Sequence, residues 1–158
     1  MGGRAPRVPR LAVLQVRSGL LPGEGGAFLR DLLAWAEGRG LARLVMLASS
    51  HSHHRGDRQL QGGSPLRYLA TTALLAAAPP PKSFAAFENE VALVPGGGEG
   101  VVVPGGGLAA RFVRACEEKG VEGCVLLKFC AEGDNTQDAM QVWRPLNLNP
   151  PFFHPPLP

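Results

Sequence analysis

The chain has 158 residues, of which 45% are hydrophobic, and a formal net charge of +3 at pH 7. These values fit one globular domain with an apolar core, and no apolar run in the sequence is long enough to cross a bilayer. The basic residues do not form a Lys/Arg block interleaved with aromatic residues, which are only 6% of the chain. The composition therefore gives no support to a nucleic-acid-binding protein.

Breaks in the sequence pattern predict one α/β domain at residues 11–144, a disordered leader at 1–10 and a Pro-rich disordered tail at 145–158. The leader lacks a convincing signal-peptide cleavage site. The cysteines lie in apolar surroundings without metal-like pairing, which predicts reduced core thiols in a cytosolic or nuclear protein. They are Cys116, Cys124 and Cys130.

The first half of the domain predicts a strand, a helix and a second strand. Leu11–Val16 has a strand-type sequence, and Ala27–Glu37 has one broad apolar face that ends before two glycines. Leu41–Ala48 contains a continuous apolar run, as expected of a strand covered on both faces of a sheet with helices on both sides. Together they predict a βαβ unit with parallel strands and a right-handed crossover.

The middle of the chain is less regular. Ser64 and Pro65 have the residue types of a helix N-cap and first turn, so a helix is predicted through Leu69 and towards Leu75. Val91–Val94 and Val101–Val103 have the composition of short strands.

The last third of the domain has clearer patterns. A helix with an apolar stripe is predicted from Leu108 to a stop at Gly120, followed by a strand at Cys124–Cys130. A short helix is predicted around Ala139 to Val142 and is expected to end at Pro145.

The polar loop after Leu41–Ala48 is the first candidate site, because ligands and partners of open α/β sheets bind at the carboxyl ends of strands. Ser50, His51 and Asp57 have the residue types of a hydrolase triad. However, adjacent residues rarely place a serine hydroxyl on the neighbouring imidazole, and the sequence has no G-x-S-x-G elbow. Turn and capping roles are favoured, and no catalytic residue is assigned.

Two further patterns suggest ligands. His51, His53 and His54 have no fourth metal ligand at a suitable spacing, so a solvated loop is predicted in place of a metal site. Gly105–Ala110 fits G-x-G-x-x-A between a predicted strand and helix, as in dinucleotide sites. The pattern occurs late in the chain and follows Pro104, and a tight turn explains the same glycines. No cofactor is therefore assigned, and a nucleotide-binding or hydrolytic enzyme remains the alternative.

Five segments together resemble the proteasome assembly chaperone 2 family, in the same order from about Leu11 to about Met140. The most specific pieces are SSH-S-x-x-R-x-D and LKF-x-x-EGDN. The segments are VLQVRS at Val13–Ser18, LARLVMLASSHSHHRGDRQL at Leu41–Leu60, SPLRYL at Ser64–Leu69, VPGGG at Val103–Gly107 and VLLKFCAEGDNTQDA at Val125–Ala139.

The resemblance implies a three-layer α/β/α sandwich, phosphorylase/hydrolase-like, with a mostly parallel or mixed central sheet. It implies a chaperone with no enzymatic activity and no cofactor that forms a heterodimer with proteasome assembly chaperone 1 and promotes assembly of the proteasome α-subunit ring. The expected location is the cytoplasm and nucleus. The specific motifs supply candidate protein-interaction or loop residues, which are Ser50, His51, Arg55, Asp57, Gly133, Asp134 and Asn135.

The sequence also departs from the family pattern. The family has a further strand before the matching piece and further helices after it, so a truncated or alternatively spliced form lacking one sheet strand is expected. Family tails dock between α-subunits through a terminal hydrophobic-Tyr-X motif, whereas this sequence ends in Pro-Pro-Leu-Pro. VPGGG occurs twice, which suggests an insertion or a mis-spliced product at Phe84–Val103.

Overall fold

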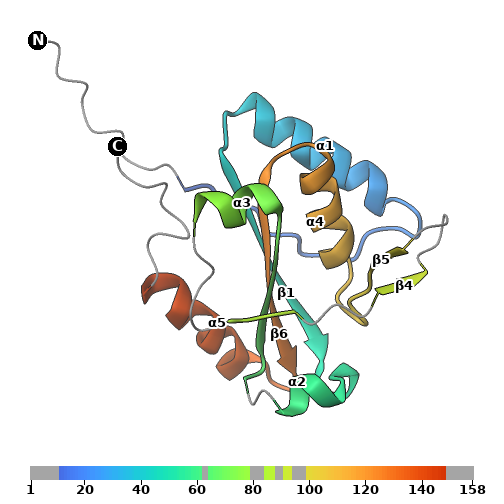
Figure 1. Ribbon diagram of the computed structural model, residues 1–158, viewed down its shortest axis with the longest axis vertical. Coiled ribbons are helices and arrows are strands. Elements are labelled where there is room, and N and C mark those ends of the chain that lie inside the picture. Colours follow the sequence, from blue (N-terminus) through green and yellow to red (C-terminus); the bar gives the residue numbers. More distant parts are fainter. Residues whose placement is uncertain (1–10, 62–63, 79–83, 88–90, 94–98, 149–158) are drawn as a thin grey trace, which may run out of the picture.

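A computed structural model describes residues 11–61, 64–78, 84–87, 91–93 and 99–148 (Figure 1). The helices of these parts are α1 (Gly25–Gly38), α2 (Asp57–Gln61), α3 (Thr72–Ala77), α4 (Ala109–Glu118) and α5 (Thr136–Leu148), with a 3-10 turn η1 (Ser52–His54). None of the helices in these ranges has the length and apolar character needed to cross a membrane.

A mixed four-stranded sheet of order β1-β6-β2-β3 forms the centre. β1 (Arg43–His51) is parallel to β6 (Glu122–Cys130), and β2 (Leu66–Ala70) is antiparallel to β6 and parallel to β3 (Ala85–Ala86). β4 (Val91–Leu93) and β5 (Glu99–Val101) form a separate antiparallel pair. The predicted α/β fold class is thus confirmed, with a mixed sheet.

Helices cover both faces of the sheet (Figure 1). One core contains α1 and α4 with Val125, Leu127 and Phe129 of β6. The other contains Leu74 of α3 with Cys124 and Leu126, and Val142 of α5 packs against it. Because successive strand residues point to opposite faces, β6 supplies both cores. We call the two sides the α1/α4 face and the α3/α5 face.

β6 is the most buried strand of the described sheet, with every residue from Gly123 to Cys130 buried. Lys128 is only 3% exposed despite its charge. Its ammonium lies 3.0 Å from Asp138 Oδ1 and donates to Gln141 Oε1 at 2.7 Å, and both partners belong to α5. A buried charge requires such partners, so this interaction fixes α5 over the carboxyl half of β6.

The expectation that Leu41–Ala48 is covered on both faces is wrong. β1 is an edge strand of the described sheet, with β6 as its neighbour. Leu44, Met46 and Ala48 pack against the core on the α1/α4 face, whereas Leu47 on the opposite face is 57% exposed. A continuous apolar run fits both an edge and a central strand, because position in the sheet depends on distant segments.

The predicted strand at Leu11–Val16 is also wrong, and the predicted βαβ unit, which requires this strand, is wrong as well. The segment is not part of a sheet, and its large side chains are 54–84% exposed. Strand propensity describes a side chain that fits a pleated surface, and it does not by itself provide a pairing partner.

The helix predicted after Ser64 and Pro65 is a strand, β2, and the helix begins later at α3. The helix prediction rested on Ser64 and Pro65, but Ser64 Oγ accepts from Leu66 N at 3.2 Å at the start of a strand. Arg67 of this strand is only 1% exposed. Its guanidinium donates to the carbonyl oxygens of Ser64 and Leu66. The N-cap of α3 is Thr71, whose Oγ1 accepts from Leu74 N at 3.3 Å.

Other predictions agree with the structure more closely. Helices α1 and α4 are confirmed, and Gly120 adopts a left-handed φ of +66° after α4, as expected of a stop. α5 does not end at Pro145 but continues to Leu148. A proline removes one main-chain hydrogen bond and bends a helix without always ending it. The predicted leader at 1–10 and residues 149–158 of the tail lie outside the described residues.

The three cysteines are free and buried, as predicted. Burial raises the pKa of the Cys116 thiol to about 11. Burial also raises the pKa of Cys124, and burial followed by the nearby Asp138 carboxylate raises that of Cys130.

Leu126 and Leu47 provide a test of the strand order, because they are register partners on the same face of neighbouring strands. Leu126 is fully buried and Leu47 is 57% exposed. Leu126→Ala should lower the free energy of unfolding by about 2–5 kcal/mol, and Leu47→Ala by less than about 1 kcal/mol. Chemical denaturation measures both. An equal loss for the two variants would contradict the edge position of β1.

Candidate functional site

The candidate residues from the two specific motifs lie at one edge of the sheet. β1 and β6 are parallel, and His51 pairs with Cys130 at their carboxyl ends. The loop after β1 leads through η1 to α2, and the loop after β6 leads to α5, so both begin at this edge (Figure 1). We call this surface, formed by residues 50–57 and 131–135, the carboxyl edge.

Ser50 holds the end of β1 to the turn before α4. Its side chain is 4% exposed, and its hydroxyl donates to the carbonyl oxygen of Pro104. In the same turn Gly105 has a φ of +66°, and a Cβ added there would lie 3.1 Å from the His54 ring and 3.4 Å from Ser50 Oγ. The polar loop and the PGGG turn, which the sequence suggested as separate sites, are therefore one packed unit. No pattern in the sequence indicated this contact.

The geometry does not assemble a hydrolase triad from Ser50, His51 and Asp57. Ser50 and His51 are consecutive residues of β1, so their side chains point to opposite faces of the sheet. Ser50 is buried against Pro104, whereas His51 is exposed. Asp57 is exposed at the first residue of α2, where a carboxylate favours the helix N-terminus.

The G-x-G-x-x-A match has a packing explanation. The strand before it, β5, pairs with β4 in a separate sheet, so the turn does not connect a strand of the main sheet to a helix. A Cβ at Gly106 would lie 2.4 Å from Val103 Cγ1, and Gly106 N donates to Val103 O at 3.0 Å. These glycines let the chain turn tightly into α4, which is a different context from that of a dinucleotide site.

The three imidazoles of the loop form an exposed cluster. The His53 ring centroid lies 5.2 Å from that of His51 and 4.2 Å from that of His54. In the described parts of the chain, no group of three or more His, Cys, Asp or Glu side chains is arranged to hold a metal ion. The cluster presents flat aromatic and hydrogen-bonding surface to solvent.

Arg55 joins the loop to the rest of the fold. Its guanidinium lies 5.7 Å from the centre of the Phe129 ring, at the end of β6, and donates to Ser64 O at 3.4 Å. The arginine of the sequence motif thus positions the loop from a half-buried site.

The second candidate segment forms the entry to α5. Gly133 has a φ of +122°. Asp134 Oδ1 accepts from Thr136 N at 2.9 Å and Thr136 Oγ1 at 2.6 Å, and these hydrogen bonds lower the pKa of the Asp134 carboxyl. Asn135 O accepts from Ala139 N at 2.9 Å. All three candidates are exposed, so they shape the turn and present it to solvent.

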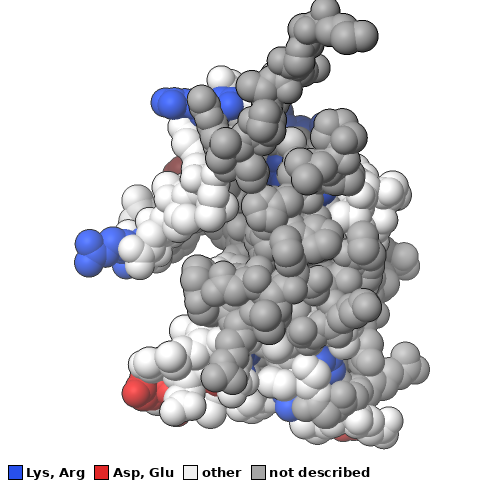
Figure 2. Space-filling model, turned by 90° about the vertical axis from the view of Figure 1, so that its left-hand side faces the viewer, with Lys and Arg blue, Asp and Glu red and all other residues white. Residues whose placement is uncertain are grey.

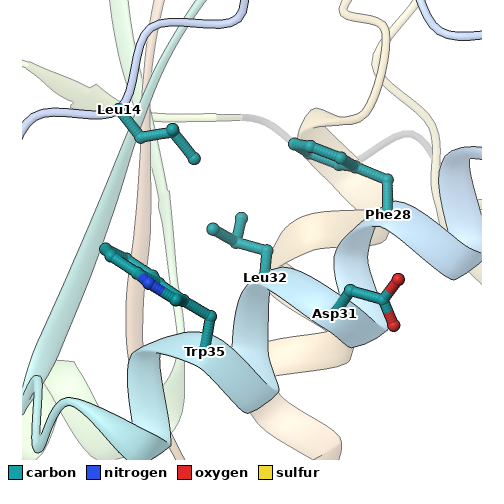
Figure 3. Close-up of a pocket in the computed structure, with 5 residues that line it drawn as sticks. All are labelled: Leu14, Phe28, Asp31, Leu32 and Trp35. Atoms are coloured by element: carbon teal, nitrogen blue, oxygen red, sulfur yellow. The ribbon is translucent and has the colours of Figure 1, made fainter.

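Two cavities of the described residues lie away from the carboxyl edge. One, of about 280 Å³, lies between Leu14 and residues of α1 (Figure 3). The other, of about 410 Å³, lies between the C-terminal half of α1 and Lys119 and Val121. The described charged side chains are scattered in the view of the α3/α5 side (Figure 2). The candidate residues of the carboxyl edge line neither of these two cavities.

The fold and this surface define an α/β protein with an exposed loop surface at the carboxyl ends of two parallel strands. No protein-family model matches the chain. Proteasome assembly chaperone 2 of Xenopus tropicalis and that of Mus musculus are each 38% identical to it over 143 residues, and that of Homo sapiens is 34% identical over 143 residues. Each match covers 87% of this chain and 54% of the relative. The chain thus resembles proteins named proteasome assembly chaperone 2 and spans about half the length of these curated relatives.

Gly105→Ala tests the contact between the PGGG turn and the His loop, with Gly120→Ala as its matched control. Both glycines have a φ of +66°, but a Cβ at Gly120 would meet no atom within 4 Å. The control should lose about 1–2 kcal/mol of unfolding free energy from the left-handed backbone alone, and Gly105→Ala should lose more. Denaturation and the NMR shifts of the His54 ring measure the effect. A His54 ring that does not respond to Gly105→Ala would contradict the contact.

Proposed function

We propose that this chain is a non-enzymatic chaperone that forms a heterodimer with proteasome assembly chaperone 1 and promotes assembly of the α-subunit ring of the core proteasome, in the cytoplasm and nucleus. The observation that carries the proposal is the similarity to proteins named proteasome assembly chaperone 2, which extends over 87% of the chain. Because the chain spans about half of these relatives, the function of the whole protein is assigned by inference.

The geometry of the carboxyl edge supports a binding function. His51, His53 and Asp57 are exposed there, beside the exposed turn at Gly133–Asn135. The loop is attached to the fold by the Ser50 hydrogen bond to Pro104 and the Arg55 contact with Phe129. A surface that is ordered before binding loses less conformational entropy when a partner docks.

A hydrolytic or nucleotide-binding enzyme has less support. The Ser50 hydroxyl is buried and already donates to Pro104 O, so it is not presented to a substrate. The space above Gly105 is occupied by the His54 ring. In the described residues, the side chains suggested for catalysis are not brought together in a cleft.

The proposed heterodimer has a direct test in solution. Large apolar side chains, including Leu47, Leu75 and Met140, are 44–63% exposed. Binding that buries such surface and selects the folded form stabilises the chain by mass action. Co-expression with proteasome assembly chaperone 1 should raise the soluble yield and give one heterodimer peak in size exclusion. A well-behaved monomer that ignores the companion would count against the proposed partner.

Charge swaps test the carboxyl edge. The double variant His51→Glu, Asp57→Lys should reduce the recovery of proteasome assembly chaperone 1 and α-subunits with the tagged chain by at least about tenfold, the effect of roughly 1.4 kcal/mol. The control is Arg30→Glu, Asp31→Lys on α1, where the side chains are 71% and 77% exposed. Both variants should remain folded, and the first should melt only slightly lower because Asp57→Lys removes a carboxylate from the start of α2. Equal recovery from both would place the interface elsewhere.

A further inference from the structure

Three imidazoles at the carboxyl edge contact one another, and we call them the His cluster. His51 ends β1, and His53 and His54 belong to η1. The His51 and His53 rings are stacked with an interplanar angle of 10° and centroids 5.2 Å apart. The His54 centroid lies 4.2 Å from that of His53 and 5.9 Å from that of His51. All three residues are exposed, so the cluster is accessible from solvent.

The loop that carries the His cluster is attached to the fold at two points. The His54 ring packs against the turn before α4, where a Cβ added to Gly105 would lie 3.1 Å from His54 Cδ2. Arg55, the next residue, donates to Ser64 O at 3.4 Å and lies over the Phe129 ring. These contacts anchor the main chain of η1, so the three imidazoles stay within one small area of the surface.

The His cluster has no negative partner in the described structure. No ion pair joins its imidazoles to an Asp or Glu of the described residues. Imidazole is the side chain that ordinarily changes charge between pH 5 and 8. As the pH falls through this range, neighbouring imidazoles become positive together, and their mutual repulsion opposes protonation. An anion supplied by a partner would offset this repulsion.

The groups around the His cluster limit the kind of anion that fits. They lie on η1, α2, β6 and its following loop, and α5, and are Arg55, Asp57, Cys130, Glu132, Asp134 and the Lys128–Asp138 ion pair. Burial raises the pKa of the Cys130 thiol, and hydrogen bonds from Thr136 lower the pKa of Asp134, so neither group changes charge between pH 5 and 8. The exposed carboxylates of Asp57, Glu132 and Asp134 would repel a long polyanion, whereas a short acidic segment can contact the rings alone.

The arrangement of the rings favours a carboxylate over a metal ion, which is the other common partner of imidazole. A metal site requires nitrogen atoms that converge on one point, and the described residues include no group of three or more His, Cys, Asp or Glu side chains arranged in that way. A carboxylate has two acceptor oxygens and can bridge two neighbouring rings.

We propose that the His cluster binds an acidic segment of a partner protein, with at least two carboxylates, and that binding strengthens as the pH falls from 8 to 6. The partner carboxylates accept N–H bonds from the imidazolium rings, and such charge-assisted bonds are stronger than neutral ones. Protonation of the rings and binding of the segment promote one another by linkage. The inference rests on the proposed binding function of the carboxyl edge, and it adds the chemistry of the partner.

An acidic peptide tests the proposal on the full chain without the companion chaperone. Hexaglutamate is titrated at pH 6.0 and at pH 8.0, at low salt and with EDTA, while NMR follows the imidazole signals. We expect binding at least about tenfold tighter at pH 6.0, with shifts of the His51 and His53 signals. His154 is the only other histidine of the sequence, and its signal should not move.

Two variants separate the His cluster from general charge. The double variant His51→Gln, His53→Gln keeps His54, whose ring contacts the Gly105 turn, and should bind hexaglutamate at pH 6.0 at least about tenfold more weakly. Arg30→Gln on α1 also removes a positive charge, from a side chain that is 71% exposed, and should bind like the wild type. If the double variant does not fold, the wild-type titration decides alone.

Several results would overturn the proposal. They are equal affinity at pH 6.0 and 8.0, equal binding by the double variant, and a shift of the His154 signal as large as those of the cluster. Tighter binding of a thymidine hexanucleotide at pH 6.0 would assign the surface to nucleic acid, and binding only when Zn²⁺ replaces EDTA would assign it to a metal. Absent peptide binding excludes the acidic segment even if proteasome assembly chaperone 1 is recovered with the chain. Peptide binding without that recovery contradicts the proposed heterodimer alone.

Discussion

The interaction between Lys128 and α5 is the constraint on which the rest of the fold depends. β6 is buried from Gly123 to Cys130, and Lys128 is the only charged residue in this stretch. Its ammonium forms an ion pair with Asp138 and donates a hydrogen bond to Gln141. Removing one partner of a buried ion pair is strongly destabilising, because the other charge is then left buried without compensation. Replacing the whole pair with well-packed apolar groups costs far less. The position of α5 is therefore coupled to the most buried strand, and the turn at Gly133–Asn135 takes its position from both.

The other end of this constraint is the carboxyl edge. β6 ends at Phe129 and Cys130, and Phe129 supports Arg55 of the neighbouring loop. Ser50 then joins the same loop to the turn before α4. Loops that are held at several points by a rigid sheet present their exposed side chains in a fixed arrangement. The core therefore holds the carboxyl edge, which is the surface proposed to bind other subunits, in a defined position.

Local patterns were sufficient to predict α1, α4 and the run that became β6. The helices have apolar stripes of helical period. Gly120 follows α4 with a left-handed backbone conformation, which a glycine predicts without reference to distant residues. The position of each strand in the sheet was not predictable, because the apolar run of β1 does not reveal which neighbours it has. Ser64 and Pro65 misled for a related reason: the same residue types begin a helix or a turn into a strand, and Ser64 Oγ here accepts from Leu66 N of β2.

The candidate site was predictable in its residues but not in its construction. The motifs at Ser50–Asp57 and Gly133–Asn135 both lie at one edge because their strands are parallel, which the sequence suggested for a different pair of strands. The contact of His54 with Gly105 joins segments that are distant in the chain. Such contacts depend on the three-dimensional path of the chain, and no local spacing encodes them.

The reactivity of the three buried thiols can be used to measure local unfolding of this protein. With a pKa of about 11, the Cys116 thiol is ionised in roughly one molecule in ten thousand at pH 7, and thiolate is the form that reacts with alkylating reagents. Cys116 lies in α4 and the other two in β6, so the helix and the central strand carry separate probes. The order in which alkylation modifies them under mild denaturant would reveal which layer of the molecule separates first.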